Sequence, residues 1–198
     1  MSETTEDVEL AQLAIAKTVG RARAGRFDQV SIALHWLTVL LILGQFATAW
    51  LVEREIAWAE TLLLVHRSMG VTTWVVVVAR LIWRRAFARL PPFPASMPKL
   101  QQRVAKLNEY ALYLLLLVQP LTGLASLLFR GRPFALFAGQ APALLMPDKP
   151  VAHALHAVHV WGAEALLVLI GVHAGAALLH GLVLRDGVLQ RMLPWTAR

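Results

Sequence analysis

The sequence predicts an all-α protein, an integral membrane four-helix bundle. Of its 198 residues 58% are hydrophobic and only 16% are charged, a balance that is unusual for a soluble domain. The apolar residues gather in four runs, each long enough for the about 20 residues that cross a bilayer. The chain is too short for a second domain of similar size. The runs cover roughly residues 30–52, 62–83, 107–129 and 152–184.

The connections between the runs are short. The second connection, "RRAFARLPPFPASMPKLQQRVAK", contains prolines that forbid a continuous helix between the second and third runs. The fourth run is longer than a bilayer requires, so its first end, with His153 and His156, should project beyond the membrane.

The net charge of +7 would suggest a nucleic-acid partner in a soluble protein, but here the basic residues follow membrane topology. Fourteen of the 19 lysines and arginines flank the run ends on one side of the membrane, which should therefore be cytoplasmic. Both termini lie on this side, and no nucleic-acid partner is expected. The other five basic residues face outward: Arg54, Arg67, Arg130, Arg132 and Lys149.

Residues 1–26 form a cytoplasmic N-terminal extension that is first acidic and then basic. No cleavable signal peptide is expected, because the first apolar run comes later than such a signal requires. A weak helical pattern in "VELAQLAIAKTVGRARAGR" leaves two possibilities open, a helix on the inner membrane surface and a mobile tail.

All seven histidines lie in or beside the four runs. His159 and His173 are fourteen residues apart, just under four helical turns, so they share a face and lie about 21 Å apart along the axis. His66, near the outer end of the second run, matches His159 in depth. His35, near the inner end of the first run, matches His173. The spacing predicts two histidine pairs, one in each leaflet.

Two opposed imidazoles suit the iron of a six-coordinate haem. Zinc is less suitable, because it takes three or four protein ligands and neither depth offers an obvious thiolate or carboxylate. The chain has no cysteine, which excludes covalently attached haem, disulfides and iron–sulfur clusters. A single membrane histidine is more often a hydrogen-bonding residue between helices. Two pairs at matched depths instead favour two non-covalent b-type haems. His35 and His173 would hold the inner iron, and His66 and His159 the outer iron.

Several neighbouring residues have two interpretations each. Arg80 lies fourteen residues after His66, so it is a candidate partner for a haem propionate, but it also fits the inner excess of positive charge. His156 is the alternative to His159 as the outer ligand. His180 could belong to a proton path or to a solvated helix end. Glu164, the one acid deep in a run, suits a proton role or simple exposure.

Four segments resemble the bacterial di-haem cytochrome b561 family: "IALHWL", "VHRSMG", "LLFRGRPFALF" and "HVWGAEALLVLIGVHAGAALLHGLVLRDGVLQRMLP". The resemblance covers about residues 27–195 and implies a four-helix transmembrane domain with two b-type haems in a bacterial inner membrane. It assigns haem ligation to the same four histidines, His35, His66, His159 and His173. The best-defined activity of the family is superoxide oxidation coupled to quinone reduction. The long segment 1–26 departs from the usual short start.

A bis-histidine haem has no open iron position for a substrate, so its role is electron transfer. We therefore expect a superoxide:ubiquinone oxidoreductase that takes electrons from superoxide, or from another outer donor, and reduces quinone in the membrane. Two alternatives stay open. One is a cytochrome b subunit that passes electrons between quinone and a partner dehydrogenase or hydrogenase. The other is a non-redox membrane protein whose histidines pack helices.

Arg130, Arg132 and Lys149 lie in the outer connection beside the predicted outer haem. A basic patch raises the encounter rate of a small anion such as superoxide. These residues are therefore candidates for steering superoxide, although a loop rich in interfacial arginine explains them equally well.

Overall fold

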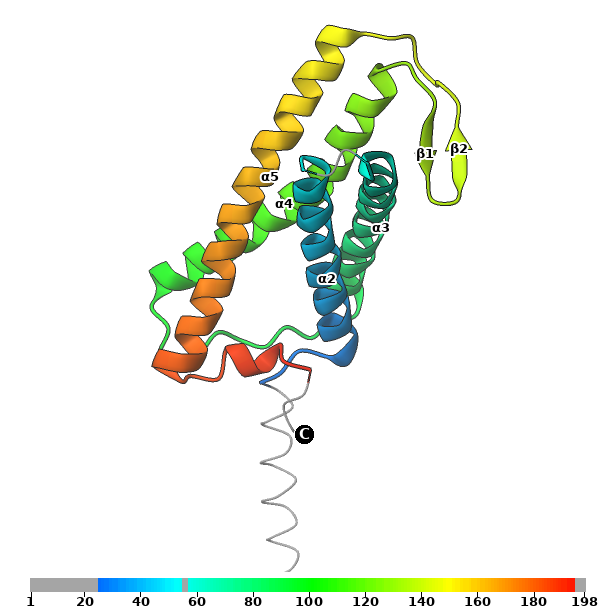
Figure 1. The fold of residues 1–198 in the computed structure, drawn as a ribbon. Coiled ribbons are helices and arrows are strands. Elements are labelled where there is room, and N and C mark those ends of the chain that lie inside the picture. The colour runs from blue at the N-terminus through cyan, green and yellow to red at the C-terminus, as the bar shows by residue number, and fades with distance from the viewer. Residues whose placement is uncertain (1–24, 55–56, 195–198) are drawn as a thin grey trace, which may run out of the picture.

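The computed structural model describes residues 25–54 and 57–194, so nearly all of the predicted extension 1–26 lies outside the described residues. Four long helices dominate the described chain (Figure 1). They are α2 (Gln29–Val52), α3 (Ala59–Ala86), α4 (Lys99–Phe129) and α5 (Lys149–Leu178). Each is long and apolar enough to cross a membrane, and the all-α four-helix prediction is confirmed.

The third helix differs from the sequence prediction at its start. α4 begins at Lys99 rather than near residue 107, because Pro98 occupies the N-cap position and no proline follows it until Pro120. Only the proline-rich part of the predicted connection is therefore non-helical.

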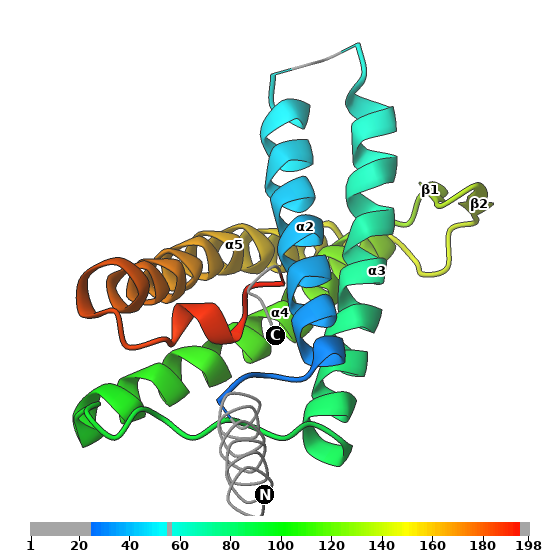
Figure 2. The same cartoon turned by 90° about the horizontal axis from the view of Figure 1, so that it is seen from below.

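The helices form two antiparallel hairpins. α2 packs along α3, α4 packs along α5, and the hairpins meet mainly through α3 and α4. Val77, Leu116 and Leu166 form a buried cluster from α3, α4 and α5. Figure 2 shows the two hairpins as separate pairs that cross one another. We call the end with the α2–α3 and α4–α5 connections the outer end, and the opposite end the inner end.

The outward faces are apolar, as expected where lipid is the solvent. Leu40, Leu114 and Val168 are 64%, 62% and 66% exposed, and each comes from a different helix. Exposure of such side chains would be unfavourable in water, so the surface itself supports membrane insertion.

The outer connection between α4 and α5 contains a β-hairpin that the sequence analysis did not anticipate. β1 (Phe134–Leu136) pairs antiparallel with β2 (Gly139–Ala141). The backbone N–H of Phe137, at the turn, donates to Ser68 Oγ at 2.7 Å. Since Ser68 lies two residues after His66, this bond fixes the hairpin beside the outer histidine of α3.

At the inner end, hydrogen bonds tie segments that are far apart in the chain. Trp36 Nε1 donates to the carbonyl of Met192 at 2.8 Å, and Arg191 Nη1 donates to the carbonyl of Pro92 at 2.5 Å. The chain reaches these contacts through a π-helical turn, Leu179–Leu184, followed by a short 3₁₀ turn, Leu189–Arg191. The C-terminal segment thus crosses beneath the bundle (Figure 1).

Asp28 caps α2 and joins it to α3. Its carboxylate accepts from the backbone N–H of Ser31 at 2.9 Å, from the Ser31 hydroxyl at 2.6 Å and from Trp83 Nε1 at 2.9 Å. Burial alone would raise the pKa of Asp28, but the hydrogen bonds from Ser31 and Trp83 outweigh burial and lower this pKa.

Replacing Asp28 with Ala should lower the thermal midpoint of the detergent-solubilised protein at pH 7, because an N-cap is worth about 1 kcal/mol. The lowered pKa means that the contribution is present above the unfolded-state pKa of 3.8 and is lost as the pH falls through the folded-state pKa. The gap between wild type and variant should therefore close in acid. Asp148→Ala is the comparison: it also removes an N-cap, but the Asp148 carboxylate accepts only from Val151 among the described residues, so the midpoint should fall less than in Asp28→Ala. Equal midpoints for wild type and Asp28→Ala at pH 7 would contradict the assignment.

Candidate functional site

The structure brings four histidines together as two opposed pairs. His66 on α3 faces His159 on α5, with ring centroids 6.3 Å apart and ring planes at 85°. His35 on α2 faces His173 on α5, with centroids 6.2 Å apart and planes at 64°. Within the described chain, no hydrogen bond joins the two rings of either pair. α5 thus supplies one imidazole at each depth.

The distance between the two rings of each pair fits a metal ion bound by both rings better than it fits direct contact between the rings. Two imidazoles that bind one ion from opposite sides, each at a metal–nitrogen distance of about 2 Å, have ring centroids roughly 6 Å apart. The same separation is too long for a direct hydrogen bond. Among residues 25–54 and 57–194, no group of three or more histidine, aspartate or glutamate side chains forms a metal site. Two ligands per ion fit a haem, whose macrocycle supplies the other four.

The outer imidazoles are oriented by hydrogen bonds that leave one nitrogen free for iron. His66 Nδ1 lies 3.2 Å from the carbonyl oxygen of Gln45, and His159 Nδ1 lies 2.9 Å from that of Gln119. Because a carbonyl only accepts, Nδ1 carries the proton in each ring. Nε2 then holds the lone pair, as a metal-binding histidine requires.

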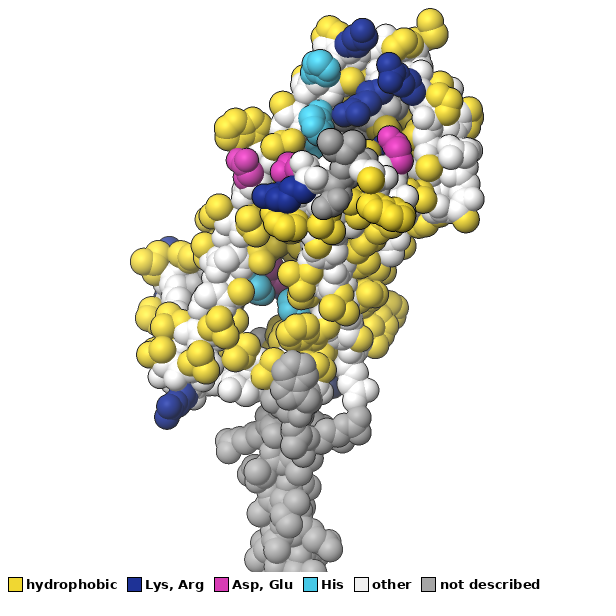
Figure 3. Space-filling view, viewed as in Figure 1, with side chains coloured by type: hydrophobic (Ala, Val, Ile, Leu, Met, Phe, Trp, Pro, Cys, Tyr) yellow, Lys and Arg dark blue, Asp and Glu magenta, His cyan; other side chains and the backbone are white. Residues whose placement is uncertain are grey.

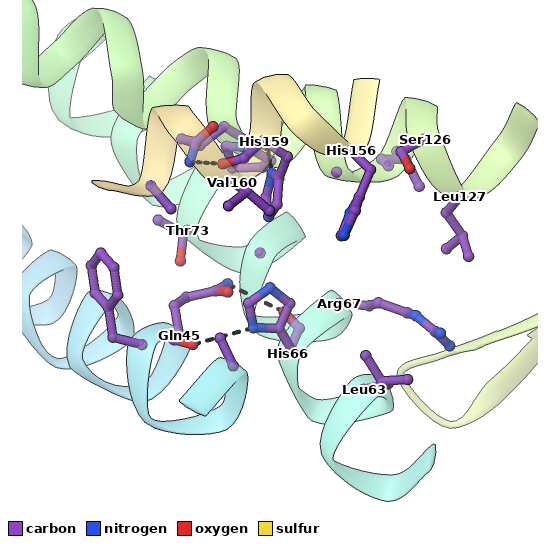
Figure 4. Close-up of a pocket in the computed structure, with 18 of the residues that line it drawn as sticks. Gln45, Leu63, His66, Arg67, Thr73, Ser126, Leu127, His156, His159 and Val160 are labelled. Carbon is purple, nitrogen blue, oxygen red and sulfur yellow. Dashed lines mark hydrogen bonds between the residues drawn. The ribbon is translucent and has the colours of Figure 1, made fainter. Parts of the chain in front are cut away.

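Gln45 and Gln119 complete this arrangement, and sequence reasoning missed them. Gln45 Nε2 donates to the backbone carbonyl of His66 at 3.2 Å, and Gln119 Nε2 donates to that of His159 at 2.8 Å. Each glutamine thus exchanges two hydrogen bonds with one histidine, a link that we call the Gln–His clamp. Figure 4 shows the Gln45 clamp beside the cavity. The clamp residues share a pattern, Gln followed by Thr three positions later, that could have been noticed in the sequence.

The threonines of this pattern also contact the outer rings. Thr48 Oγ1 lies 3.1 Å from His66 Nδ1, and Thr122 Oγ1 lies 3.3 Å from His159 Nδ1. Both hydroxyls donate to backbone carbonyls of their own helices, so their oxygens are free to accept from the imidazole. Each outer Nδ1–H therefore has two oxygen atoms within reach.

A cavity of about 550 Å³ lies between the hairpins at the outer pair. Its wall is mainly apolar and includes His66, His159 and Gly123. A Cβ at Gly123 would lie 2.9 Å from His159 Cε1, so this position requires glycine for the ring to fit. An apolar slot with two facing imidazoles is the environment that a b-type haem needs.

His156, the alternative outer ligand, also lines this cavity and lies nearer its outer mouth (Figure 4). It is exposed, and His66 forms its ring contact with His159 instead. Glu164 is exposed on the cavity wall as well. The geometry thus favours His159 as the partner of His66.

The inner pair has a different environment. Within the described chain neither His35 nor His173 has a hydrogen-bond partner, and His35 Nδ1 is buried. His173 is exposed where the two hairpins separate. Figure 3 shows a hollow between the hairpins with histidine side chains at its rim. The inner imidazoles are held by their helices alone.

Arg80 lies at the inner level, as its position on α3 predicted. Its guanidinium carbon is 5.4 Å from the Tyr113 ring centroid on α4. The nearby carboxylate of Glu109 is bound to Arg84 at 2.9 Å. Among the described residues no ion pair joins Arg80 to a carboxylate.

The three predicted steering residues meet in a second cavity of about 550 Å³ at the outer end. Arg130, Arg132 and Lys149 line it together with Arg67, and Glu60 is the one acid among the described residues of its wall. Figure 3 shows lysine and arginine side chains gathered at this end of the molecule. Arg67 and Arg130 line both cavities, so the basic cavity is continuous with the wall of the outer histidine cavity.

His180 is not a solvated helix end. It is 5% exposed and lies in the π-helical turn after α5. Its Nδ1 contacts Asp186 Oδ2 at 2.5 Å, and its Nε2 lies 2.9 Å from Gln101 Nε2 on α4. Slight burial alone would raise the pKa of Asp186, but the hydrogen bond from His180 outweighs it and lowers this pKa. The seven-residue spacing from His173 indicated the face but not the partners.

Fold and site together define a class: a four-helix membrane protein with two opposed histidine pairs at two depths of the bundle. A model of the prokaryotic cytochrome b561 family matches residues 26–195. The chain belongs to this family, which confirms the resemblance. Membership implies b-type haem and membrane electron transfer by a multi-pass bacterial oxidoreductase.

Three relatives have similar sequences, each aligned over 172 residues and 85% of this chain. Cytochrome b561 homolog 1 of Escherichia coli (strain K12) is 29% identical over 97% of its length. Cytochrome b561 homolog 2 of the same organism is 30% identical over 91% of its length. The probable superoxide oxidase CybB of Yersinia pestis is 29% identical over 96% of its length.

The Gln–His clamp predicts the effect of one added methyl group. A Cβ at Gly162 would lie 2.6 Å from Gln119 Oε1, so Gly162→Ala should displace Gln119 and release His159. We expect altered absorption from one haem and a lower thermal midpoint. Gly171→Ala, on the same helix, is the matched control, because nothing lies within 4 Å of its Cβ position. Identical haem spectra for the two variants would contradict the role of the clamp.

Proposed function

We propose that this protein oxidises superoxide at its outer end and reduces ubiquinone within the membrane, through two bis-histidine b-type haems. The observation that carries the proposal is the presence of two opposed imidazole pairs, with centroids 6.2 and 6.3 Å apart, on helices that cross the membrane. When bound, each haem supplies a one-electron redox centre without an open iron position.

The protein's own residues hold these centres in defined places. His66 and His159 would bind the outer iron, with Nδ1 fixed by the clamps and Nε2 directed to the metal. His35 and His173 would bind the inner iron. Arg80 is suited to pair with a propionate, because it is a guanidinium at membrane depth and the Glu109 carboxylate is bound to Arg84.

The outer donor is proposed from the basic cavity. Superoxide is a small anion that needs little shape recognition, so charge acts mainly on its encounter rate. Arg130, Arg132 and Lys149 lie together beside the outer histidine cavity, which supports their role in steering. The relative from Yersinia pestis that is named a probable superoxide oxidase supports the same donor.

The overall reaction balances with two electrons. Two superoxide anions lose one electron each and leave as dioxygen, while one ubiquinone gains two electrons and two protons to become ubiquinol. The cytoplasm is the source of protons if both termini face it, as the charge distribution predicts. His180 and Asp186 form a hydrogen-bonded pair at the inner end. This pair is suited to pass the protons from the cytoplasm into the membrane.

Haem content and pairing are the first test. Purified protein should contain two non-covalent b-type haems per chain, low-spin in both redox states. His66→Ala and His159→Ala should perturb one and the same haem, and His35→Ala and His173→Ala the other. His156→Ala is the control and should perturb neither. A haem-to-protein ratio near zero would refute the proposal, and loss of the outer haem in His156→Ala alone would reassign the outer ligand.

Superoxide-dependent haem reduction tests the donor. The double variant Arg130→Glu, Arg132→Glu should reduce more slowly with an unchanged haem spectrum. Higher ionic strength should slow the wild type, because screening shortens the reach of surface charge to about 8 Å at physiological salt. Arg54→Glu, at the outer end but not among the residues lining the basic cavity, is the matched charge control. If the rate of haem reduction changes with neither salt nor charge reversal, the result would favour a protein or quinol donor, as in an electron-transfer subunit.

A further inference from the structure

The outer end of the molecule has few basic residues, yet most of them converge on one cavity. Of the five that the charge distribution places at this end, four line the basic cavity: Arg67, Arg130, Arg132 and Lys149. Membrane topology favours few cations on an outer surface, so topology does not explain this convergence. We propose that the basic cavity is a binding site for a phosphate group, supplied by free phosphate or by the headgroup of an anionic lipid.

The four cations come from separate elements and have no partner within the protein. Arg67 lies on α3, Arg130 follows α4, Arg132 belongs to the connection and Lys149 begins α5. Among the described residues, none of these four side chains forms a hydrogen bond or an ion pair. Glu60 is the one carboxylate among the described residues of the wall. Positive charge therefore exceeds negative charge in this cavity, and an anion would balance it.

The number of donors and the size of the cavity fit a phosphate better than a diatomic anion. Each guanidinium offers five N–H donors in a planar fork that matches a pair of phosphate oxygens. Gln140 and His153 add neutral donors to the wall. The cavity measures about 550 Å³, whereas one water molecule occupies about 30 Å³ in the liquid. A phosphate group therefore fits together with bridging waters or the rest of a headgroup.

The helix ends and the depth of the cavity favour the same ligand. α3 and α5 begin here, since Glu60 and Ala152 of the wall lie in their first turns. The positive ends of two helix dipoles thus approach the cavity, against one negative end from α4. The cavity lies at the ends of membrane-crossing helices, which is the depth of lipid headgroups. Phosphate from water and phosphate from a lipid can therefore both reach it.

Two of the four cations separate this site from the outer histidine cavity. Arg67 and Arg130 line both cavities, whereas Arg132 and Lys149 line only the basic cavity. Changes at Arg132 and Lys149 should therefore weaken phosphate binding and leave the haem spectrum unchanged. A bound phosphate would also neutralise the cations proposed to steer superoxide, and so slow haem reduction. That consequence rests on the proposed function, but phosphate binding itself does not.

Calorimetric titration of the detergent-solubilised holoprotein with inorganic phosphate tests the site. Sodium chloride keeps the ionic strength constant, and binding should saturate at one phosphate per chain. The double variant Arg132→Gln, Lys149→Gln should bind at least roughly tenfold more weakly, because each lost charge-assisted hydrogen bond typically costs about a factor of ten. Arg54→Gln is the matched control and should keep the wild-type affinity. Arg54 lies at the same end, but its guanidinium carbon is 4.0 Å from the Trp50 ring centroid.

A second arm distinguishes the two sources of phosphate. The protein is reconstituted in nanodiscs of phosphatidylcholine and phosphatidylglycerol, and retained lipid is then counted by native mass spectrometry. Retained phosphatidylglycerol that blocks inorganic phosphate identifies a lipid headgroup as the ligand. Phosphate binding without retained phosphatidylglycerol identifies the free ion. In either case the double variant should lose the ligand, and Arg54→Gln should keep it.

The outcomes keep this inference apart from the proposed function. The inference is overturned if neither probe binds, if sodium chloride alone reproduces the binding heat, or if the double variant binds as wild type does. Superoxide-dependent haem reduction is measured with phosphate at constant ionic strength and should become slower in the wild type. Phosphate that binds as stated without slowing this reaction supports the site and counts against the steering of superoxide through it.

Discussion

An imidazole inside a membrane bundle has two nitrogen atoms to satisfy and almost no water to satisfy them. At the outer pair the Nδ1–H of each ring is satisfied by a backbone carbonyl from the neighbouring helix of the same hairpin. That bond fixes the ring and turns Nε2 toward the opposite hairpin. The centroids of the two rings are 6.3 Å apart, a separation that suits one metal ion between them. The pairing of the helices, the cavity and the glycine at position 123 in its wall all depend on this constraint.

The two hairpins meet this constraint with the same arrangement. In the first, Gln45 and Thr48 on α2 hold His66 on α3; in the second, Gln119 and Thr122 on α4 hold His159 on α5. The contacts match atom for atom, although the connecting loops differ in length and structure. The outer site therefore lies between two equivalent units, each of which supplies one imidazole.

The equivalence ends at the inner level. His173 lies fourteen residues after His159, whereas the residue fourteen positions after His66 is Arg80. Likewise, ten residues before Gln45 is His35, but ten before Gln119 is Glu109. Each hairpin thus places one imidazole and one charged side chain at this depth. The inner level thus gains Arg80 and Glu109, and the two sites become chemically different while their ring separations remain similar.

The sequence by itself determined the four spans, their apolar outward faces and the depths of the histidines. These features depend on local composition and on the 1.5 Å rise of a helix, which are independent of tertiary contacts. Residue types also carried the family resemblance, since the histidine-containing segments are specific. The start of α4 was misplaced, because the proline that ends the connection lies earlier than the change in hydropathy suggests.

The tertiary structure decided which atoms meet. Gln45 and Gln119 are 21 and 40 residues from the histidines that they hold, so spacing on one helix could not reveal them. His180 became a buried residue because the chain turns back after α5 and brings Asp186 against it. The basic cavity likewise required the β-hairpin to place Arg132 beside Arg67. Contacts of this kind depend on how helices pack and loops close, and that information is shared among residues far apart in the chain.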